Sequence, residues 1–143
     1  MSERVVGIHS GRRGKVSEIA LKNVLEHSGL EYLVFELTDL ALETCDACLG
    51  CLGSNRCVKK DGVNEIVDAM SEASALVFAG PEYWDGVHAK ARAFWERVCF
   101  MGRHNEAFPL QHLLGVIVGV SGHGDASAAI GDLRAFFEDA RIN

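Results

Sequence analysis

Four cysteines lie close together in the sequence, at positions 45, 48, 51 and 57. Their C-x2-C-x2-C-x5-C spacing is typical of proteins that wrap thiolates around an iron–sulfur cluster, where the fourth cysteine closes the site. Structural zinc sites pair two separate C-x2-C knuckles, which this segment lacks, whereas redox-active free thiols remain an alternative. The spacing therefore predicts that Cys45, Cys48, Cys51 and Cys57 ligate one cluster. The fifth cysteine, Cys99, stands between apolar residues and is expected to pack in the core.

A second chemically versatile segment, residues 10–17, reads Ser-Gly-Arg-Arg-Gly-Lys-Val-Ser. It joins an apolar run to an amphipathic one, where a helix should begin and where free N–H groups and the helix dipole favour an anion. The glycines let the backbone approach closely, the serines can donate hydrogen bonds, and Arg12, Arg13 and Lys15 can neutralise a dianion. The segment is neither a P-loop nor a dinucleotide fingerprint. It predicts a site for a single phosphate, with a solvated polar turn as the alternative.

Two further loops carry groups suited to a flat ring. Residues 80–87 read Gly-Pro-Glu-Tyr-Trp-Asp-Gly-Val, and the adjacent Tyr83 and Trp84 offer apolar surface while glycine and proline fix the backbone. The alternative is that these two rings cover the core. Residues 121–124, Ser-Gly-His-Gly, form a weaker signal, because glycine again allows the backbone to approach a ligand.

Apolar periodicity predicts the elements that must position these loops. Apolar or β-branched runs predict strands at 4–9, 31–37, 75–79 and 113–120. Helices are predicted between these strands and after the last one. The first helix presents one face, formed by Val16, Ile19, Ala20, Val24 and His27. The second helix is expected to have Asp61 as its N-cap. Such alternation demands a parallel sheet whose ligands bind beyond the carboxyl ends of the strands. The phosphate and ring loops are all expected at that edge.

The composition is that of an ordinary globular protein. The 143 residues, 48% hydrophobic and 24% charged, suffice for a single domain over 1–143, with a cysteine-rich loop at about 38–60. A net charge of −6 argues against nucleic acid and anionic membranes as partners. No apolar run approaches the roughly 20 residues that span a bilayer. Because the first residues lead straight into a strand, no secretory signal is expected and a cytoplasmic location is predicted.

Taken in order, these motifs resemble those of the iron–sulfur flavoproteins, a branch of the flavodoxin-like, NADPH-dependent FMN reductase superfamily, over residues 4–137. The resemblance implies that Ser10, Arg12 and Ser17 bind the FMN phosphate. It also implies that the isoalloxazine ring is lined by Pro81, Glu82, Tyr83, Trp84 and Gly86, with Ser121 and Gly122 as a looser match. The cysteine spacing is the one that this branch uses for a [4Fe–4S] cluster.

The resemblance further implies a three-layer, flavodoxin-like α/β fold with strand order 2-1-3-4, whose fifth strand is missing or supplied by a partner. The implied function is electron transfer, in which a [4Fe–4S] cluster relays electrons to or from FMN and no catalytic acid–base group is needed. Ferredoxin or NAD(P)H is the implied redox partner, and a homodimer or homotetramer the implied assembly. Two alternatives stay open: an NAD(P)H-dependent FMN or quinone reductase without a cluster, and a truncated interaction domain without enzymatic activity.

Overall fold

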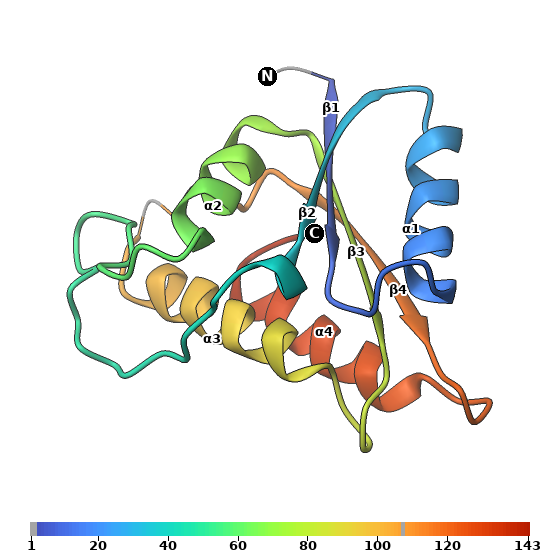
Figure 1. Ribbon diagram of the computed structural model, residues 1–143. Coiled ribbons are helices and arrows are strands. Elements are labelled where there is room, and N and C mark those ends of the chain that lie inside the picture. The colour runs from blue at the N-terminus through green and yellow to red at the C-terminus, as the bar shows by residue number, and fades with distance from the viewer. Residues whose placement is uncertain (1–2, 107) are drawn as a thin grey trace.

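Strands and helices alternate along the chain in the computed structural model, which describes residues 3–106 and 108–143 (Figure 1). The strands are β1 (Arg4–His9), β2 (Glu31–Glu36), β3 (Ala75–Pro81) and β4 (Leu114–Val120). The helices are α1 (Val16–His27), α2 (Val63–Glu72), α3 (Ala89–Arg103) and α4 (Ser127–Asp139), and a 3-10 turn, η1 (Leu37–Asp39), follows β2. Each predicted element is present, with its ends shifted by a few residues.

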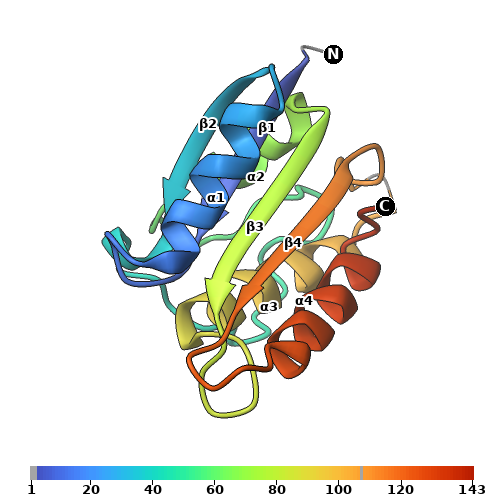
Figure 2. The ribbon, with the colours of Figure 1, turned by 90° about the vertical axis from the view of Figure 1, so that its right-hand side faces the viewer.

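The strands form one parallel sheet in the order β2-β1-β3-β4, which confirms the predicted order. In the register Val5 lies opposite Tyr32 on one side and Ala75 on the other, and Ala75 lies opposite Leu114. Because all strands run the same way, the loops after β1, β3 and β4 leave from the same edge of the sheet (Figure 2).

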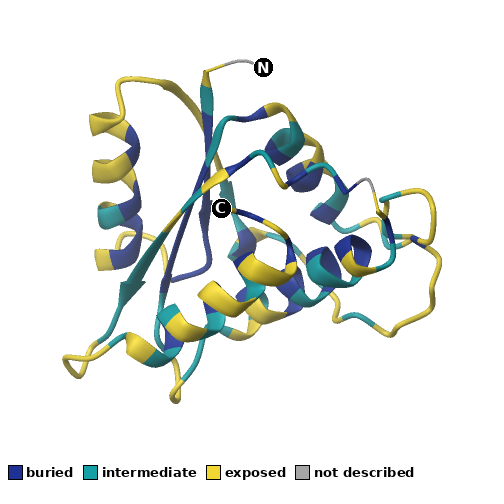
Figure 3. Cartoon of the chain, turned by 180° about the vertical axis from the view of Figure 1, so that it is seen from behind, coloured by how far each residue is buried: buried dark blue, intermediate teal, exposed yellow. Residues whose placement is uncertain are grey.

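The layers around this sheet are unequal. Helix α1 covers one face, and α2, α3 and α4 cover the other (Figures 1 and 2). The larger core lies under these three helices, around Phe78, Phe94 and Trp95, and the smaller one holds Leu21 and Leu25 of α1 against the sheet. Figure 3 shows the buried residues on the inward sides of the helices. None of the described helices is long and apolar enough to cross a membrane.

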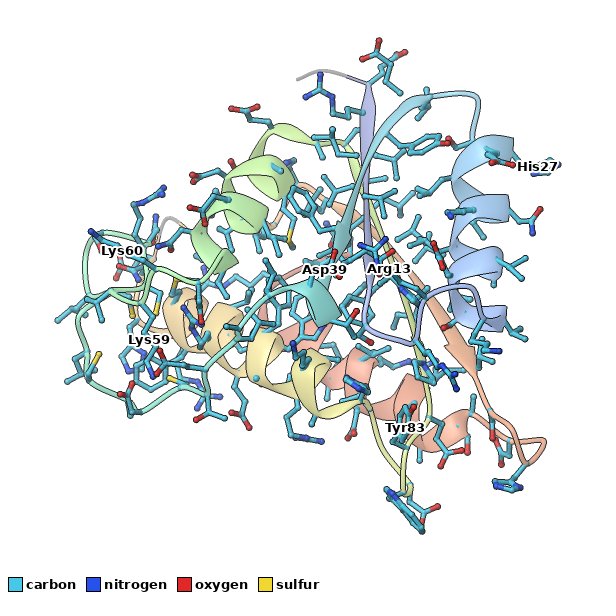
Figure 4. The ribbon with its side chains drawn as sticks, viewed as in Figure 1. Arg13, His27, Asp39, Lys59, Lys60 and Tyr83 are labelled. Carbon is cyan, nitrogen blue, oxygen red and sulfur yellow. The ribbon has the colours of Figure 1, made fainter. Side chains whose placement is uncertain are left out.

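The buried face of α1 differs from the predicted one. Val16, Ile19 and Val24 are exposed, and His27 points away from the sheet (Figure 4). The buried residues of this helix are Ser17, Glu18, Leu21 and Leu25. Gly7 of β1 decides the orientation, since a Cβ there would lie 2.7 Å from Leu25 Cδ1. The two leucines therefore fill the space that Gly7 leaves open, and the more apolar stripe faces outward.

The start of α2 is the second correction. Asp61 was expected as the N-cap, but the helix begins at Val63 with Gly62 as its N-cap, in the left-handed region at φ 99°. The Asp61 carboxylate instead accepts hydrogen bonds from the Glu43 amide and from Arg97 of α3. The carboxylate that the local sequence pattern assigned to the helix end is therefore paired with a buried guanidinium, while a hydrogen bond with the Val63 amide still contributes to lowering the pKa of Asp61.

Strand β4 is an edge strand of the described sheet. Asn143 pairs with its beginning, because the Asn143 amide donates to the Leu113 carbonyl at 3.0 Å and the Gly115 amide donates to the Asn143 carbonyl at 2.6 Å. Leu114 and Val116 lie on the same face of the sheet as α1, in a part that this helix does not cover, and are exposed. Apolar surface therefore continues from the edge of the sheet onto this part of the face.

Candidate functional site

The first loop brings its two serines to the sheet edge in different ways. Ser10 directly follows β1 and is buried against Gly80, and its hydroxyl oxygen has no hydrogen-bond partner among the described residues. Ser17 lies in the first turn of α1 and lines a hollow of about 230 Å³ together with Arg12, Lys15 and other residues. Among the described residues, Ser10 is not one of those that line this hollow, whereas Ser17 at the helix N-terminus lines it together with two cations, a setting that suits a bound anion.

Of the three cations expected around the phosphate, two line this hollow. Arg13 turns instead toward Asp39, with which it forms an ion pair (Figure 4). This hydrogen-bonded pairing with Asp39 raises the pKa of Arg13. Arg12 and Lys15 are therefore the side-chain charges available to a ligand in the hollow.

The helix N-terminus also carries a carboxylate that the sequence analysis did not single out. Glu18 accepts a hydrogen bond from the Gly14 amide and pairs with Lys22 at 2.7 Å. These hydrogen bonds, with that from Lys22 the larger effect, lower the pKa of Glu18. The signal was an acidic residue in the first helical turn, where the helix dipole favours it.

His9 is the other functional residue that the sequence analysis missed. Its ring ends β1, is fully buried, and contacts the Glu36 carboxylate through Nδ1 at 2.6 Å and the Ser17 hydroxyl through Nε2 at 2.9 Å. A histidine at the carboxyl end of a buried strand was the available signal, but Glu36 is 27 residues away in sequence. Only the pairing of β1 with β2 brings the two side chains together.

The second and third loops form a larger hollow, of about 680 Å³, next to the first. Six predicted ring contacts line it: Pro81, Glu82, Tyr83, Trp84, Ser121 and Gly122. Glu82 joins the two loops, because its carboxylate accepts hydrogen bonds from the Ser121 hydroxyl at 2.9 Å and from the Asp85 amide at 3.0 Å. Pro81 and Tyr83 line both hollows, so the two are continuous along these residues.

The two aromatic residues of the second loop differ in their surroundings. Tyr83 packs edge-on against His88, with ring centroids 5.2 Å apart, and lies beside the first loop (Figure 4). Trp84 is 97% exposed and, like Asp85, has a positive φ. Such a backbone conformation is uncommon for a bulky residue and is typical of tight hairpin turns and functional sites. Gly86 closes the turn, where a Cβ would lie 2.9 Å from the carboxylate of Asp132 in α4.

The cysteine-rich loop, which belongs to a different part of the sequence from the residues of these two hollows, brings its four cysteines to one place. Cys45, Cys48, Cys51 and Cys57 all line one small hollow against α3. The loop reaches this shape through left-handed residues at Ala47, Leu49, Gly53 and Asn55. Burial raises the pKa of the Cys51 thiol, whereas Cys48 is exposed. Across 3–106 and 108–143, no three His, Cys, Asp or Glu side chains are arranged to hold a metal ion.

Arg97 of α3 is a buried positive charge beside these thiols. It lines the same hollow and pairs with Asp61. Its Nε and Nη2 atoms have no hydrogen-bond partner of ordinary geometry among the described residues. Burial alone would lower the pKa of Arg97, but Asp61 and the Cys57 thiol outweigh it and raise that pKa. A buried cation next to four thiols suits a negatively charged group there.

Cys99, by contrast, faces the core. Its thiol lies 3.3 Å from the Phe136 carbonyl, as donor to that oxygen. Burial raises the pKa of Cys99 to about 12, so the thiol stays protonated and weakly nucleophilic.

A parallel sheet in the order β2-β1-β3-β4, covered by helices on both faces and with hollows at its carboxyl edge, has the architecture of a flavodoxin-like protein. The family model described as NADPH-dependent FMN reductase matches residues 4–141. The chain therefore belongs to the NADPH-dependent FMN reductase family.

Relatives and solved structures agree with this assignment. The chain is 28% identical to an iron–sulfur flavoprotein of Methanocaldococcus jannaschii over 94% of its length and 71% of the relative's. An iron–sulfur flavoprotein of Archaeoglobus fulgidus is 31% identical over 62% of this chain, and the match spans 40% of that protein. In fold, the chain is similar to RosB (TM-score 0.75, 15% identity, 99% of this chain and 61% of RosB). An FMN-dependent NADH-azoreductase from Bacillus anthracis gives a TM-score of 0.69 at 15% identity, over 97% of this chain and 82% of that one.

Proposed function

We propose that this chain binds FMN at the carboxyl edge of its sheet and exchanges electrons between FMN and a [4Fe–4S] cluster held by Cys45, Cys48, Cys51 and Cys57. The observation that carries the proposal is the meeting of three loops at one edge, with a cation-lined hollow beside a ring-sized one. The relatives named iron–sulfur flavoproteins support the same reading.

The residues of the first loop fit a phosphate. Ser17 lines the hollow, Arg12 and Lys15 supply positive charge there, and the buried Ser10 hydroxyl in the same loop has no partner among the described residues. The ring would then extend past Pro81 and Tyr83 into the larger hollow, whose rim holds Glu82 and Ser121. FMN, when bound, supplies a ring that accepts one or two electrons, and the chain supplies its binding and orientation.

The cysteine-rich loop fits a cluster in composition and charge. The four thiols line one hollow, and the buried guanidinium of Arg97 faces them. Iron–sulfur clusters are held by four thiolates, whose negative charge such a cation offsets. Helix α3 links the two sites, because the His88 ring at its start packs on Tyr83 and Arg97 lies nine residues further on, roughly 14 Å along the axis.

A cluster-free NAD(P)H-dependent FMN or quinone reductase is the second candidate. One observation favours it: within the described part of the chain, no group of metal-ligating side chains is already arranged to hold a metal. In the first candidate ferredoxin or NAD(P)H is the electron donor, in the second NAD(P)H; in both, the assembly is a homodimer or homotetramer.

The visible spectrum of protein purified without oxygen, together with its iron and flavin content, tests the proposal. Flavin bands with a broad iron–sulfur shoulder and about four irons per chain are expected. Flavin bands without iron would favour the cluster-free reductase. Neither chromophore, after incubation with FMN and with iron and sulfide, would leave a domain that acts through its surface alone.

A further inference from the structure

A buried chain of hydrogen bonds lies behind the phosphate hollow. Glu36 of β2 contacts His9 Nδ1 at 2.6 Å, and His9 Nε2 contacts the Ser17 hydroxyl at 2.9 Å. Ser17 is the member that lines the hollow, while the His9 ring is fully buried. A carboxylate only accepts hydrogen bonds, so Nδ1 is the donor to Glu36. Whether His9 Nε2 donates or accepts then depends on the direction in which the Ser17 hydroxyl points its proton.

The hydroxyl of Ser17 has a single proton, and this limits the arrangement. With a neutral His9, that proton is donated to Nε2, and the hydroxyl can only accept from a ligand. A phosphate dianion carries no proton to donate, so it binds Ser17 only as an acceptor. Ser17 must then turn its proton to the phosphate, and Nε2 must become the donor to the Ser17 oxygen.

We propose that Glu36, His9 and Ser17 form a proton relay that directs the Ser17 hydroxyl at a bound phosphate, with His9 as an imidazolium in the complex. The second imidazole proton comes from solvent when the phosphate binds, and it returns to solvent on release. His9 and Glu36 are positioning residues, because they act on the ligand through Ser17. This inference rests on the proposed function, since it takes the FMN phosphate as the ligand.

Two carboxylates lie near the His9 ring. Glu36 contacts it from β2, and Glu18 of α1 lies near enough to interact with it electrostatically. His88, at the start of α3, interacts with it electrostatically, and burial lowers the pKa of His88, which disfavours a second charge there. Arg13 and Lys22 interact with Glu36 but pair with Asp39 and Glu18 respectively.

Gly11 keeps the relay open to the hollow. A Cβ at this position would lie 2.6 Å from the Ser17 hydroxyl oxygen, 2.9 Å from His9 Nε2 and 2.9 Å from Pro81 Cδ. A side chain there would push between the hydroxyl and any ligand. The backbone of Gly11 can therefore lie directly over the relay, as close approach to a phosphate requires.

The test compares Glu36→Gln with the wild type in binding to FMN, riboflavin and inorganic phosphate. Glutamine keeps the shape but removes the charge that holds the imidazolium. FMN affinity is expected to fall about tenfold or more, with riboflavin affinity unchanged, because riboflavin lacks the phosphate. Glu31→Gln, at the other end of the same strand, is the matched control and should change neither. In a Ser17→Ala background, Glu36→Gln should have no further effect on FMN.

Nitrogen-15 NMR of labelled His9 gives a readout that a purely structural role would not move. In the FMN complex both ring nitrogens are expected to carry protons. An unprotonated ring nitrogen there, or an equal loss of FMN and riboflavin binding in Glu36→Gln, would overturn the relay. If inorganic phosphate binds and yields the imidazolium while FMN does not bind, the relay stands and the flavin function fails. If neither FMN nor phosphate binds, both fail.

Discussion

Arg12 and Arg13 are neighbours in sequence with different partners in space. Arg12 lines the hollow of about 230 Å³ beside the start of α1, whereas Arg13 forms an ion pair with Asp39. We expect Arg12→Ala to weaken FMN binding about tenfold to a hundredfold, since a hydrogen bond to a charged group contributes about 1.5–3 kcal/mol. Titration calorimetry with FMN and riboflavin measures the effect, and riboflavin should be indifferent. Arg13→Ala is the matched control; a larger effect there than at Arg12 would contradict the assignment.

Glu18 gives a residue-scale prediction about pH. Its folded-state pKa is lowered, chiefly by the hydrogen bond from Lys22 and then by that from the Gly14 amide. The ionised carboxylate therefore stabilises the fold above the unfolded-state pKa of about 4.3, and this contribution is lost as pH falls through the lower folded value. Glu18→Gln should reduce the free energy of unfolding at neutral pH by about 0.5–1 kcal/mol.

Urea unfolding at neutral pH and at about pH 3 measures this difference, which should shrink on acidification. Glu26, an exposed carboxylate on the same helix, supplies the control variant Glu26→Gln. An equal loss for Glu18→Gln at both pH values would mean that packing, and not charge, is responsible.

At the scale of the elements, the cysteine-rich loop packs against α3, and residues of both line the hollow of the four cysteines. Cys51 is the buried thiol of the four and lines their hollow with Arg97, whereas Cys99 on α3 faces the core. We expect Cys51→Ser to abolish iron–sulfur absorbance and bound iron while FMN content stays nearly unchanged, because the described residues that line the two hollows at the sheet edge include none from this loop. Metal analysis and visible spectra of Cys51→Ser and Cys99→Ser provide the comparison. Unchanged iron content in Cys51→Ser would exclude the cysteine assignment.

The second loop places two carboxylates at the expected ring site, Glu82 and Asp85, which line the larger hollow. Reduction of a flavin adds negative charge to its ring, and a carboxylate at about 6 Å opposes it by roughly 2–3 kcal/mol at an effective dielectric near 20, before screening. Glu82→Gln and Asp85→Asn should therefore raise the flavin midpoint potential in a spectroelectrochemical titration. Glu31→Gln, at the amino end of β2 and so at the opposite edge of the sheet from the loops, should not. No shift in either variant would show that both carboxylates are screened by solvent.

At the scale of the whole molecule, the sheet exposes β4 at its edge and, next to it, part of the face that α1 covers elsewhere. Asn143 pairs with the beginning of β4, and Leu114 and Val116 expose apolar surface beside it. An exposed apolar edge strand favours pairing with another chain. We therefore expect the protein to self-associate through β4.

Light scattering tests this expectation. Val116→Lys should shift the assembly toward monomer, whereas Leu30→Lys, with the same 37% exposure but beside the opposite edge strand β2, should not. A monodisperse wild-type monomer with normal FMN content would refute self-association.

Local sequence alone determined the order of strands and helices and the loops that meet at the sheet edge. Short apolar runs, glycine- and proline-containing turns and the direction of parallel strands are consequences of neighbouring residues. This order placed Arg12, Ser17, Tyr83 and Trp84 at the sheet edge, where they line two continuous hollows, whereas Ser10 and Gly86 are not among the residues that line them; their role in binding stays a prediction. The cysteine spacing predicted that the four cysteines lie close together, because only twelve positions separate the first from the last, and all four line one hollow; that they ligate a cluster stays a prediction.

Tertiary structure decided the features that depend on residues far apart in sequence. Gly7 leaves room for Leu21 and Leu25, so that the side of α1 that carries these leucines packs on the sheet. Arg13 forms an ion pair with Asp39 and therefore does not line the hollow beside Arg12 and Lys15. Arg97 forms a buried ion pair with Asp61. It also lines the hollow of the four cysteines and so places a positive charge beside their thiols. His9 acquired its role only when β2 placed Glu36 beside it and α1 placed Ser17 against its other nitrogen. Sequence patterns report local periodicity, whereas a buried charge is paired with whichever opposite charge the fold brings within reach.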